Sequence, residues 1–274
     1  MEKRRTGDLK LIQELNRSII LDVIRKKGPI SRSEIAKTVG ISPTTATSAV
    51  NDLIKDKLVY ENGVGNSSGG RKPVMLCFNP NVYSIIGVAL SNSIIKIAEI
   101  NLEGKVIRKQ IYSNRQLFGE EMVRYFLEAI GQFINEQLSV VKCQGISIIT
   151  PGIVDTDNGI ITYNSKLRLF NVPLKKLVEE KTGLPTLIEN DANSYVVAEN
   201  YFGLFSKYKD MLYITLGDGV GSGIMVDGSI YRGHMGSSGE IGHTTVVLDG
   251  VRCECGNKGC LENYVNWPTI YSRD

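Results

Sequence analysis

Apolar residues recur at helical spacing in the first part of this chain. Across residues 9–27 they fall three or four positions apart, which predicts an amphipathic helix that a following Gly-Pro pair ends. Ser31 and Glu34 then form a capping box, and the apolar positions behind it predict a second helix that runs to Gly40. The front of the chain is therefore expected to be a set of short helices.

A third helix is expected directly after the second, across a turn at Gly40 and Ile41. Ser42 suits its N-cap and Pro43 its first turn. Two short helices joined in this way form a helix-turn-helix, whose second helix can enter the major groove of DNA. We expect the exposed start of that helix to offer small hydroxyl groups to bases or phosphates: Ser42, Thr44, Thr45, Thr47 and Ser48.

A glycine- and serine-rich stretch, residues 61–73, comes next and carries Arg71 and Lys72 near its end. The strand-like residues 74–78 follow it, which predicts a winged hairpin whose basic tip can lie on the DNA backbone or in the minor groove. Residues 1–72 hold 14 Lys and Arg against 8 Asp and Glu, and the remainder holds 18 against 21. A basic front domain favours a polyanion partner. A solvated basic surface, or a helical dimerisation or linker domain with a loose loop, is the alternative.

Beyond residue 80 the pattern changes to short apolar strands that alternate with helices. This alternation predicts an α/β domain with a mixed sheet covered by helices, in which ligands bind beyond the carboxyl ends of strands. The expected strands are 84–90, 94–102, 105–112, 144–149, 185–188 and 211–216, and the expected helices are 120–138, 173–182 and 192–201.

Two polar segments follow strands of this domain. Asp191 comes after one strand and could hydrogen-bond a sugar hydroxyl or act as a general base, but an aspartate there also suits a helix N-cap. The glycine-rich residues 217–223 follow another strand, where backbone amides could approach a phosphate or the chain could form a tight hairpin. The residues alone leave both choices open.

One imidazole and three thiols lie close together in the sequence, at His243, Cys253, Cys255 and Cys260. They form a complete tetrahedral ligand set for a structural zinc ion, with no open position for water, and soft sulfur ligands favour zinc over hard cations. An iron-sulfur cluster usually takes four thiolates. The alternative without a metal is three buried free cysteines beside a surface histidine.

The composition is that of an ordinary soluble globular protein, with 42% hydrophobic and 22% charged residues. No membrane span is expected, and the basic N-terminus has no apolar run behind it of the kind that a secretory signal needs. The five cysteines are an odd number, and three of them belong to the metal-ligand pattern. A cytoplasmic protein is expected, because a reducing compartment fits these cysteines better than a disulfide framework.

Several motifs together resemble the ROK family, a group of repressors and sugar kinases on the actin-like, ribonuclease H-like ATPase fold. The matching residues are 151–155 (PGIVD), Asn164, 189–193 (ENDAN), the glycine-rich 216–223, 239–243 (GEIGH) and the cysteine motif 253–262. The resemblance implies an α/β actin-like ATPase body at 81–274. It also implies a winged helix-turn-helix DNA-binding domain at 1–80, similar to the branch of xylose and N-acetylglucosamine repressors. Chains of the family usually continue past the cysteine motif, so the second lobe is expected to be incomplete at Asp274.

The resemblance further implies which residues bind which ligand. Zinc would be held by His243, Cys253, Cys255 and Cys260. A monosaccharide would be contacted by Asn164, Asn190, Asp191, Glu240, His243 and Glu262. Carboxylates and amides of this kind clamp several hydroxyls at once, so such a site rejects analogues that lack them. Asp191, the catalytic base of the family's kinases, would remain here as a sugar ligand.

One departure from the family pattern separates its two branches. The kinases carry an Asp-x-Gly-Gly-Thr phosphate loop in the first hairpin, where this chain reads Ala89-Leu90-Ser91-Asn92-Ser93. The aspartate that would help hold magnesium and both glycines are absent. Asp218 also brings a negative charge to the second loop, where a small hydroxyl residue is usual. ATP binding and kinase activity are therefore not expected.

The leading hypothesis is a sugar-responsive transcriptional repressor of carbohydrate-metabolism genes without enzyme activity. It would bind a palindromic double-stranded operator as a homodimer and leave it when a monosaccharide inducer occupies the cleft. The alternative is an ATP-dependent sugar kinase, of the glucokinase or N-acetylglucosamine kinase type, with an appended DNA-binding domain. A third hypothesis is that a phosphoprotein partner regulates the body.

Overall fold

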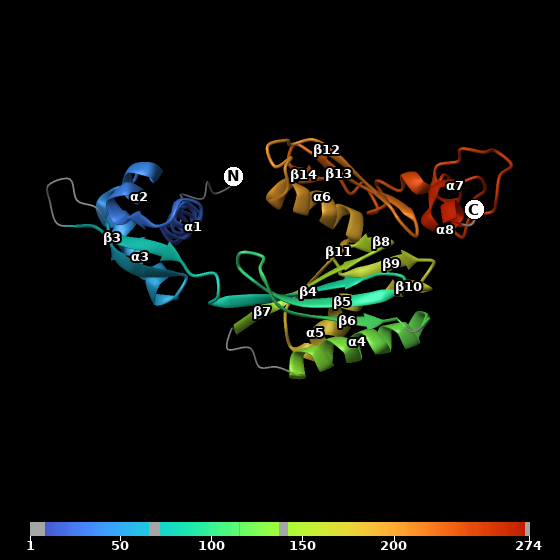
Figure 1. Ribbon diagram of the computed structural model, residues 1–274, viewed down its shortest axis with the longest axis horizontal. Coiled ribbons are helices and arrows are strands. Elements are labelled where there is room, and N and C mark those ends of the chain that lie inside the picture. Colours follow the sequence, from blue (N-terminus) through green and yellow to red (C-terminus); the bar gives the residue numbers. More distant parts are fainter. Residues whose placement is uncertain (1–8, 66–71, 115, 137–141, 272–274) are drawn as a thin grey trace, which may run out of the picture. The chain divides into compact units, whose positions relative to one another are not determined.

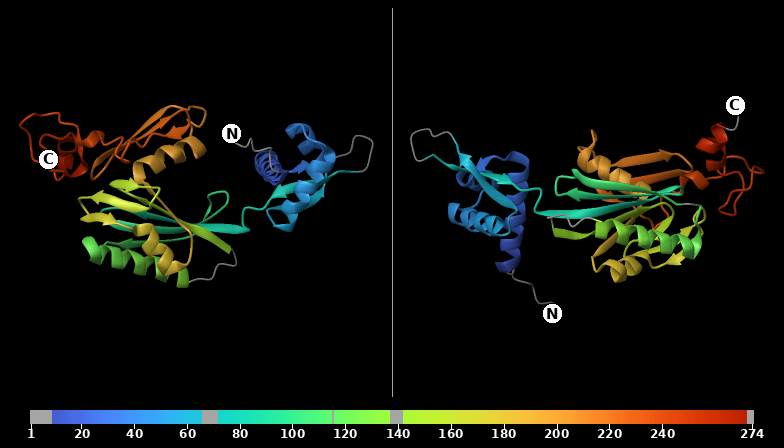
Figure 2. Two further views of the ribbon diagram at one scale, coloured as in Figure 1. Left: turned by 180° about the vertical axis from the view of Figure 1, so that it is seen from behind. Right: turned by 60° about the horizontal axis from the view of Figure 1, so that its bottom comes forward.

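The computed structural model describes residues 9–65, 72–114, 116–136 and 142–271 (Figures 1 and 2). The chain separates into two compact units. The first comprises the chain up to Tyr83 together with Asn101–Glu103, and the second comprises Ser84–Ile100 and the chain from Gly104 onward. None of the described helices is both long enough and apolar enough to cross a membrane.

The first unit has the architecture of a winged helix-turn-helix. Its elements are α1 (Leu9–Lys27), β1 (Ile30–Ser31), α2 (Arg32–Val39), α3 (Pro43–Lys55), β2 (Val59–Val64) and β3 (Val74–Phe78). The strands pair antiparallel in the order β1-β3-β2, and β2 and β3 form the predicted wing. Ser31 and Glu34 form the predicted capping box, and Gly40 ends α2 in the left-handed region. Ser42 caps α3 by accepting a hydrogen bond from Thr45 N.

Helix α1 buries only its second half. Ile20 and Ile24 are enclosed in the core of the first unit. The apolar residues of its first half are exposed, with Leu11 at 62% and Leu15 at 58% of full exposure. The apolar spacing predicted the helix correctly but overestimated its buried face, because α2, α3 and β3 enclose only the second half within this unit.

A five-stranded sheet in the order β11-β7-β4-β5-β6 is the centre of the second unit. Its strands and covering helices are β4 (Tyr83–Leu90), β5 (Ile94–Asn101), β6 (Val106–Ser113), α4 (Gly119–Glu136), β7 (Lys142–Thr150), α5 (Leu174–Thr182) and β11 (Thr186–Asn190). Strands β5 and β6 pair antiparallel whereas β7 and β11 pair parallel, so the sheet is mixed as predicted. Helices α4 and α5 cover one face of it (Figure 1), where Phe126, Phe133 and Val178 are buried in the core.

Two smaller three-stranded sheets also belong to this unit. One consists of β8 (Ile153–Asp155), β9 (Ile160–Asn164) and β10 (Leu169–Val172). The other consists of β12 (Met211–Leu216), β13 (Val220–Val226) and β14 (Ser229–Ile230), and it packs on α6 (Asp191–Phe202). The short elements η1 (Ile241–His243), α7 (Glu262–Val265) and α8 (Trp267–Tyr271) follow. The sequence pattern missed β8, β9 and β10, because strands of three to five residues show too few alternations.

The glycine-rich stretch forms a tight hairpin between β12 and β13, one of the two alternatives that the sequence left open. Gly217 N donates to Gly219 O at 2.9 Å across the turn. A Cβ atom on Gly223 would lie 2.3 Å from Ala192 O, so glycine is required where β13 crosses the start of α6. This glycine is explained by close packing of the hairpin on the helix.

Candidate functional site: a polar cavity and a His-Cys cluster

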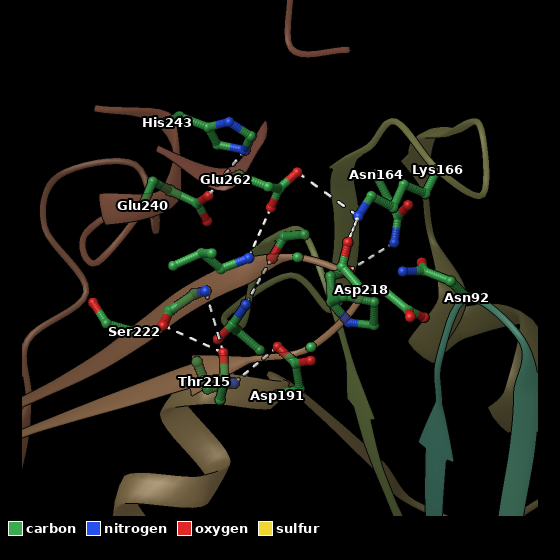
Figure 3. A pocket seen from close by; sticks show the side chains of 18 of the residues that line it. Asn92, Asn164, Lys166, Asp191, Thr215, Asp218, Ser222, Glu240, His243 and Glu262 are labelled. Atoms are coloured by element: carbon green, nitrogen blue, oxygen red, sulfur yellow. Dashed lines mark hydrogen bonds and ion pairs between the residues drawn. The ribbon is translucent and has the colours of Figure 1, made fainter. Parts of the chain in front are cut away.

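A cavity of about 910 Å³ opens in the second unit beyond the ends of β7 and β11 (Figure 3). These two strands run parallel and end together at the pair Thr150 and Asn190, so the segments that follow them meet at one edge of the sheet. The β12–β13 hairpin and residues of the segment 239–262 line the same cavity. Its position is that expected for a ligand site in an α/β domain.

The structure brings all six predicted sugar-contacting residues to this cavity. They come from the end of β9, the junction of β11 with α6, and the segment 239–262: Asn164, Asn190, Asp191, Glu240, His243 and Glu262. Figure 3 shows five of these side chains, those of Asn164, Asp191, Glu240, His243 and Glu262, around the common space. Residues that lie almost one hundred positions apart in the sequence thus line one cavity.

Asn164 and Asn190 hold the backbone that shapes the cavity. Asn164 Nδ2 donates to Pro151 O and Asn190 Nδ2 donates to Gly152 O, both at 2.9 Å. Each Oδ1 accepts from the backbone amide three residues further along the chain, at 2.9 and 3.0 Å respectively. A carboxamide can make four hydrogen bonds, so each side chain keeps capacity to contact a ligand.

Asp191 is the first residue of α6 and lines the cavity. Asn190 caps the helix, so the N-cap role that the sequence left open for Asp191 belongs to its neighbour. Asp191 Oδ1 accepts from Ala192 N at 2.8 Å, and burial raises the pKa of the Asp191 carboxyl above its ordinary value. A carboxylate in such surroundings is a strong acceptor for a ligand hydroxyl, because a low local dielectric strengthens hydrogen bonds.

Glu240 and Glu262 add two further carboxylates to the cavity. Burial raises the pKa of Glu240; His243 acts in the opposite direction, and the charges of Asp191 and Glu262 add to the increase. His243 Nε2 lies 3.8 Å from Glu240 Oε2. Glu262 Oε2 accepts from Val220 N at 2.8 Å, which fixes the carboxylate against the hairpin. The cavity is therefore rich in acceptors for hydroxyl groups.

Lys166 is a cavity residue that the sequence reasoning missed. Its Nζ donates to Asp218 O at 2.5 Å and lies 3.7 Å from Glu262 Oε1, so it joins the loop after β9 to the β12–β13 hairpin and to α7. In the sequence, the only feature that could have indicated Lys166 as a site residue was its position two residues after Asn164. Tyr195 and Tyr213 also line the cavity, with ring centroids 5.8 Å apart, and nothing in their spacing marked them.

The turn between β4 and β5 lies at the cavity, in the position where the resemblance places the phosphate loop of kinases. Ser91 Oγ accepts from Ile94 N at 3.1 Å and from Ser93 N at 3.4 Å, and it donates to Ile94 O at 3.0 Å. Asn92 O accepts from Asn114 Nδ2. Two backbone amides of this turn are thus already bonded to a side chain of the same turn.

The predicted metal ligands form a cluster. The ligand atoms of His243, Cys253, Cys255 and Cys260 all lie within 4.8 Å of one another. Cys253 Sγ is 3.6 Å from His243 Nδ1, and Cys255 Sγ is 3.7 Å from Cys260 Sγ. In a tetrahedral zinc site with ordinary bond lengths, these two edges measure about 3.5 and about 3.8 Å. The donor types and their spacing fit a zinc ion.

The protonation state of the thiols also affects whether the cluster can bind a metal ion. Burial raises the pKa of Cys253, and it raises the pKa of Cys260 to about 12, with neighbouring thiols adding to the increase. Thiols with such pKa values are protonated at neutral pH unless a metal ion displaces the proton. Zinc would bind these residues as thiolates and release protons.

The predicted DNA-contacting hydroxyls divide into two groups. Ser42 and Thr45 bond to each other at 2.8 Å, and Thr47 Oγ1 donates at 2.8 Å to the carbonyl four residues before it, so these three serve their own helix. Thr44 and Ser48 are exposed on α3, and within the described residues their hydroxyls make no hydrogen bond. Thr44 and Ser48 are therefore the hydroxyls of α3 that are free for a ligand.

The wing contributes one of its two predicted basic residues to the described part of the chain. Lys72 is exposed two residues before β3, and Arg71 lies outside the described residues. Arg32, the first residue of α2, pairs with Glu61 of β2 at 3.0 Å. This ion pair joins the wing to the helix-turn-helix at the surface of the unit.

Comparison with known proteins finds two families along this chain. The ROK family model matches residues 85–272, and a model for winged helix-turn-helix DNA-binding matches residues 13–60. The xylose repressor of Caldicellulosiruptor bescii is 36% identical over 269 residues, which are 97% of this chain and 67% of the relative. The DNA-binding transcriptional dual regulator NagC of Escherichia coli is 33% identical over 268 residues, which are 97% of this chain and 66% of the relative.

A solved structure, described as a ROK family transcriptional regulator and homolog of the E. coli MLC protein, superposes with a TM-score of 0.79. It is 28% identical and covers 96% of this chain and 67% of its own. The fold is thus an actin-like α/β ATPase body with a winged helix-turn-helix at its N-terminal side, which confirms the predicted fold class. The chain belongs to the ROK family. It spans about two thirds of the length of the relatives it matches.

Proposed function

We propose that this chain is a sugar-responsive DNA-binding transcriptional repressor of carbohydrate-metabolism genes. The observation that carries the proposal is the occurrence, on one chain, of a helix-turn-helix and of a cavity lined by carboxylates and amides. The similarity to a xylose repressor and to a transcriptional regulator supports it. Such a protein acts on chromosomal DNA, so it works in the cytoplasm.

In the proposed complex, α3 enters the major groove of operator DNA. Thr44 and Ser48 are the side chains offered to base edges, since their hydroxyls are exposed and unengaged among the described residues. The basic residues Arg71 and Lys72 of the wing neutralise backbone phosphates and position the unit without reading sequence. A homodimer would present two such helices to the half-sites of a palindromic operator.

In the proposed sugar complex, a monosaccharide occupies the 910 Å³ cavity. Asp191, Glu240 and Glu262 accept hydrogen bonds from its hydroxyls, and Asn164 and Asn190 use their remaining amide capacity. His243 contributes its imidazole beside Glu240. A site whose buried polar groups are paired by a hydroxyl discriminates against analogues that lack that hydroxyl, because the groups are then left unpaired.

Zinc has a structural role in the proposal. His243, Cys253, Cys255 and Cys260 would hold the ion, and four protein ligands leave no position for a substrate or an activated water. When bound, the ion supplies no chemistry and fixes the segment that carries Glu240 and Glu262. The metal centre and the sugar site are thereby coupled through His243, which belongs to the cluster and lines the cavity.

The response to sugar follows from linkage. Lys166 joins the two sides of the cavity, and a sugar between them would favour one arrangement of those sides over others. If the DNA-binding arrangement of the homodimer is a different one, the sugar weakens DNA binding by the factor by which DNA weakens sugar binding. Couplings of about 5- to 150-fold are typical.

An ATP-dependent sugar kinase is the second candidate, and one observation favours it. Asp191 lies in the cavity with the pKa raised by burial, as a general base requires. The β4–β5 turn opposes it, because Ser91 occupies the amides of Ser93 and Ile94 that a phosphate would need. Sugar-dependent ATP turnover that disappears in Asp191→Asn would favour the kinase over the repressor.

The experiment that tests the DNA-binding proposal measures affinity for the DNA upstream of the protein's own coding region. Ser48→Glu places a carboxylate on the exposed face of α3 and should weaken binding by at least roughly tenfold, about 1.4 kcal/mol, through repulsion by phosphates. Ser206→Glu, an exposed position in the second unit, is the matched control and should bind as the wild type does. Equal affinity of the two variants would contradict the proposed role of α3.

A further inference from the structure

The charged side chains that line the cavity are mostly acidic. Five carboxylates belong to it: Asp191, Asp218, Glu240, Glu254 and Glu262. Lys166 is the one lysine among the lining residues that the structure describes, and no arginine is among them. A phosphate ester, which carries a charge of about −1.5 to −2 at neutral pH, would enter this cavity against a negative field.

The ammonium group of Lys166 is already engaged. Its Nζ donates to Asp218 O at 2.5 Å and lies 3.7 Å from Glu262 Oε1. An incoming phosphate would have to compete for this lysine with a carboxylate of the chain itself. It would also approach the carboxylate of Asp218, the residue whose backbone carbonyl Lys166 binds (Figure 3).

Several backbone amides of the cavity that could bind an anion are engaged in the same way. Anion sites form where amides at a helix start or in a turn are free. Here Val220 N donates to Glu262 Oε2, and Ala192 N at the start of α6 donates to Asp191 Oδ1, both at 2.8 Å. In the β4–β5 turn, Ser91 Oγ accepts from two amides. At all three places an oxygen of the chain occupies the position that a phosphate oxygen would take.

We infer that the cavity binds an uncharged sugar and excludes sugar phosphates. The inference rests on the proposed function and names the class of inducer. Hydroxyl groups of a free sugar can donate to the carboxylates, whereas a phosphate group at neutral pH brings mainly acceptors to a cavity rich in acceptors. The inducer is then a sugar before any phosphoryl-transfer step, and a kinase that phosphorylates it removes the signal.

The test compares free sugars with their own phosphate esters by isothermal titration calorimetry on the full chain. The pairs are xylose with xylose 5-phosphate, glucose with glucose 6-phosphate, and N-acetylglucosamine with its 6-phosphate. One free sugar is expected to bind, and its phosphate ester is expected to bind at least roughly tenfold more weakly, about 1.4 kcal/mol. Asp218→Asn should reduce this ratio because it removes one charge from the cavity. Asp249→Asn is the matched control, since Asp249 is exposed outside the cavity.

Each contrary result has a distinct meaning. A phosphate ester that binds as tightly as its free sugar, or more tightly, would overturn the inference and leave the sugar-responsive function standing. An Asp218→Asn variant with the ratio of the Asp249→Asn control would contradict the charge argument and with it the inference. If neither member of any pair binds, the proposed function itself fails, and the inference that rests on it fails too.

Discussion

Replacing Cys260 by serine removes one of the four predicted zinc ligands from a segment that lies outside the hydrophobic core clusters of the described residues. The two hydrophobic core clusters of the described residues contain no residue beyond Ile188. Two isolated β-bridges are recorded within the segment 239–262. Backbone hydrogen bonds such as Leu261 N to Thr244 O, at 2.9 Å, also join its two ends. A zinc ion would add a cross-link among four of its residues, so we expect the loss of zinc to destabilise this segment locally.

The size of the effect follows from the loop that the ion closes. Zinc joins His243 to Cys260, which are 17 positions apart. A cross-link that closes a loop of about 15 residues lowers the entropy of the unfolded chain by an amount equivalent to roughly 3 kcal/mol. We expect Cys260→Ser to lose its zinc and to lower the free energy of opening this segment by about 3 kcal/mol. Sugar affinity should fall as well, because Glu240 and Glu262 lie in the segment.

Two measurements on the same preparations check this prediction. Elemental analysis should find about one zinc per chain in the wild type and almost none in Cys260→Ser. Hydrogen exchange of residues 239–262 should be about a hundredfold faster in the variant, which corresponds to roughly 3 kcal/mol. Cys143→Ser is the matched control, because Cys143 is a free cysteine of β7 outside the cluster. Stoichiometric zinc in Cys260→Ser, or a wild type that is equally protected after metal removal, would refute the reasoning.

Three further predictions concern the wing, the cavity and the core. Lys72→Ala should reduce the salt slope of DNA binding by about one unit, while Lys109→Ala in the second unit leaves it unchanged; equal slopes would exclude Lys72 from the interface. Burial raises the pKa of Asp191 in the folded state. The contribution of this carboxyl to the free energy of unfolding is therefore favourable at low pH and is lost as the pH rises through that pKa. Asp191→Asn should therefore raise the unfolding temperature near pH 7, with a gain that shrinks toward pH 4; a gain independent of pH in thermal unfolding would contradict this. Arg108 Nε donates to Glu99 Oε2 at 2.8 Å, and Glu99 is 2% exposed, so Arg108→Met should cost about 3–5 kcal/mol in urea unfolding. The exposed Lys109→Met should cost less than about 0.5 kcal/mol, and similar costs for both would show that the pair contributes little.

The sequence predicted the helical elements well where local chemistry decides them. Ser31 with Glu34, and Ser42 with Pro43, mark helix starts that the structure has at those positions. These signals are reliable because a cap satisfies backbone amides of its own first turn, independently of the rest of the fold. The same reasoning offered Asp191 as a cap of α6, whereas the structure has Asn190 in that position, a residue type that suits it equally well.

The pattern of apolar residues could not predict features that depend on tertiary packing. The exposed first half of α1 has the same spacing as the buried half, and only the placement of α2, α3 and β3 distinguishes them. Lys166 is recognised as a site residue only by its contacts with Asp218 and Glu262, which lie 52 and 96 positions away in the sequence. The sequence could not show why residue 223 is a glycine, because its reason is the close contact of β13 with the start of α6.

The measurement that tests the account most directly is fluorescence anisotropy of labelled upstream DNA with the wild-type protein, titrated with xylose, glucose and N-acetylglucosamine without ATP. The account predicts that the protein binds the DNA and that one of these free sugars weakens binding by about 5- to 150-fold. It also predicts that Asp191→Asn still binds the DNA but responds only at higher sugar concentrations. DNA binding that no sugar changes, or a response that appears only with ATP, would contradict the central claim.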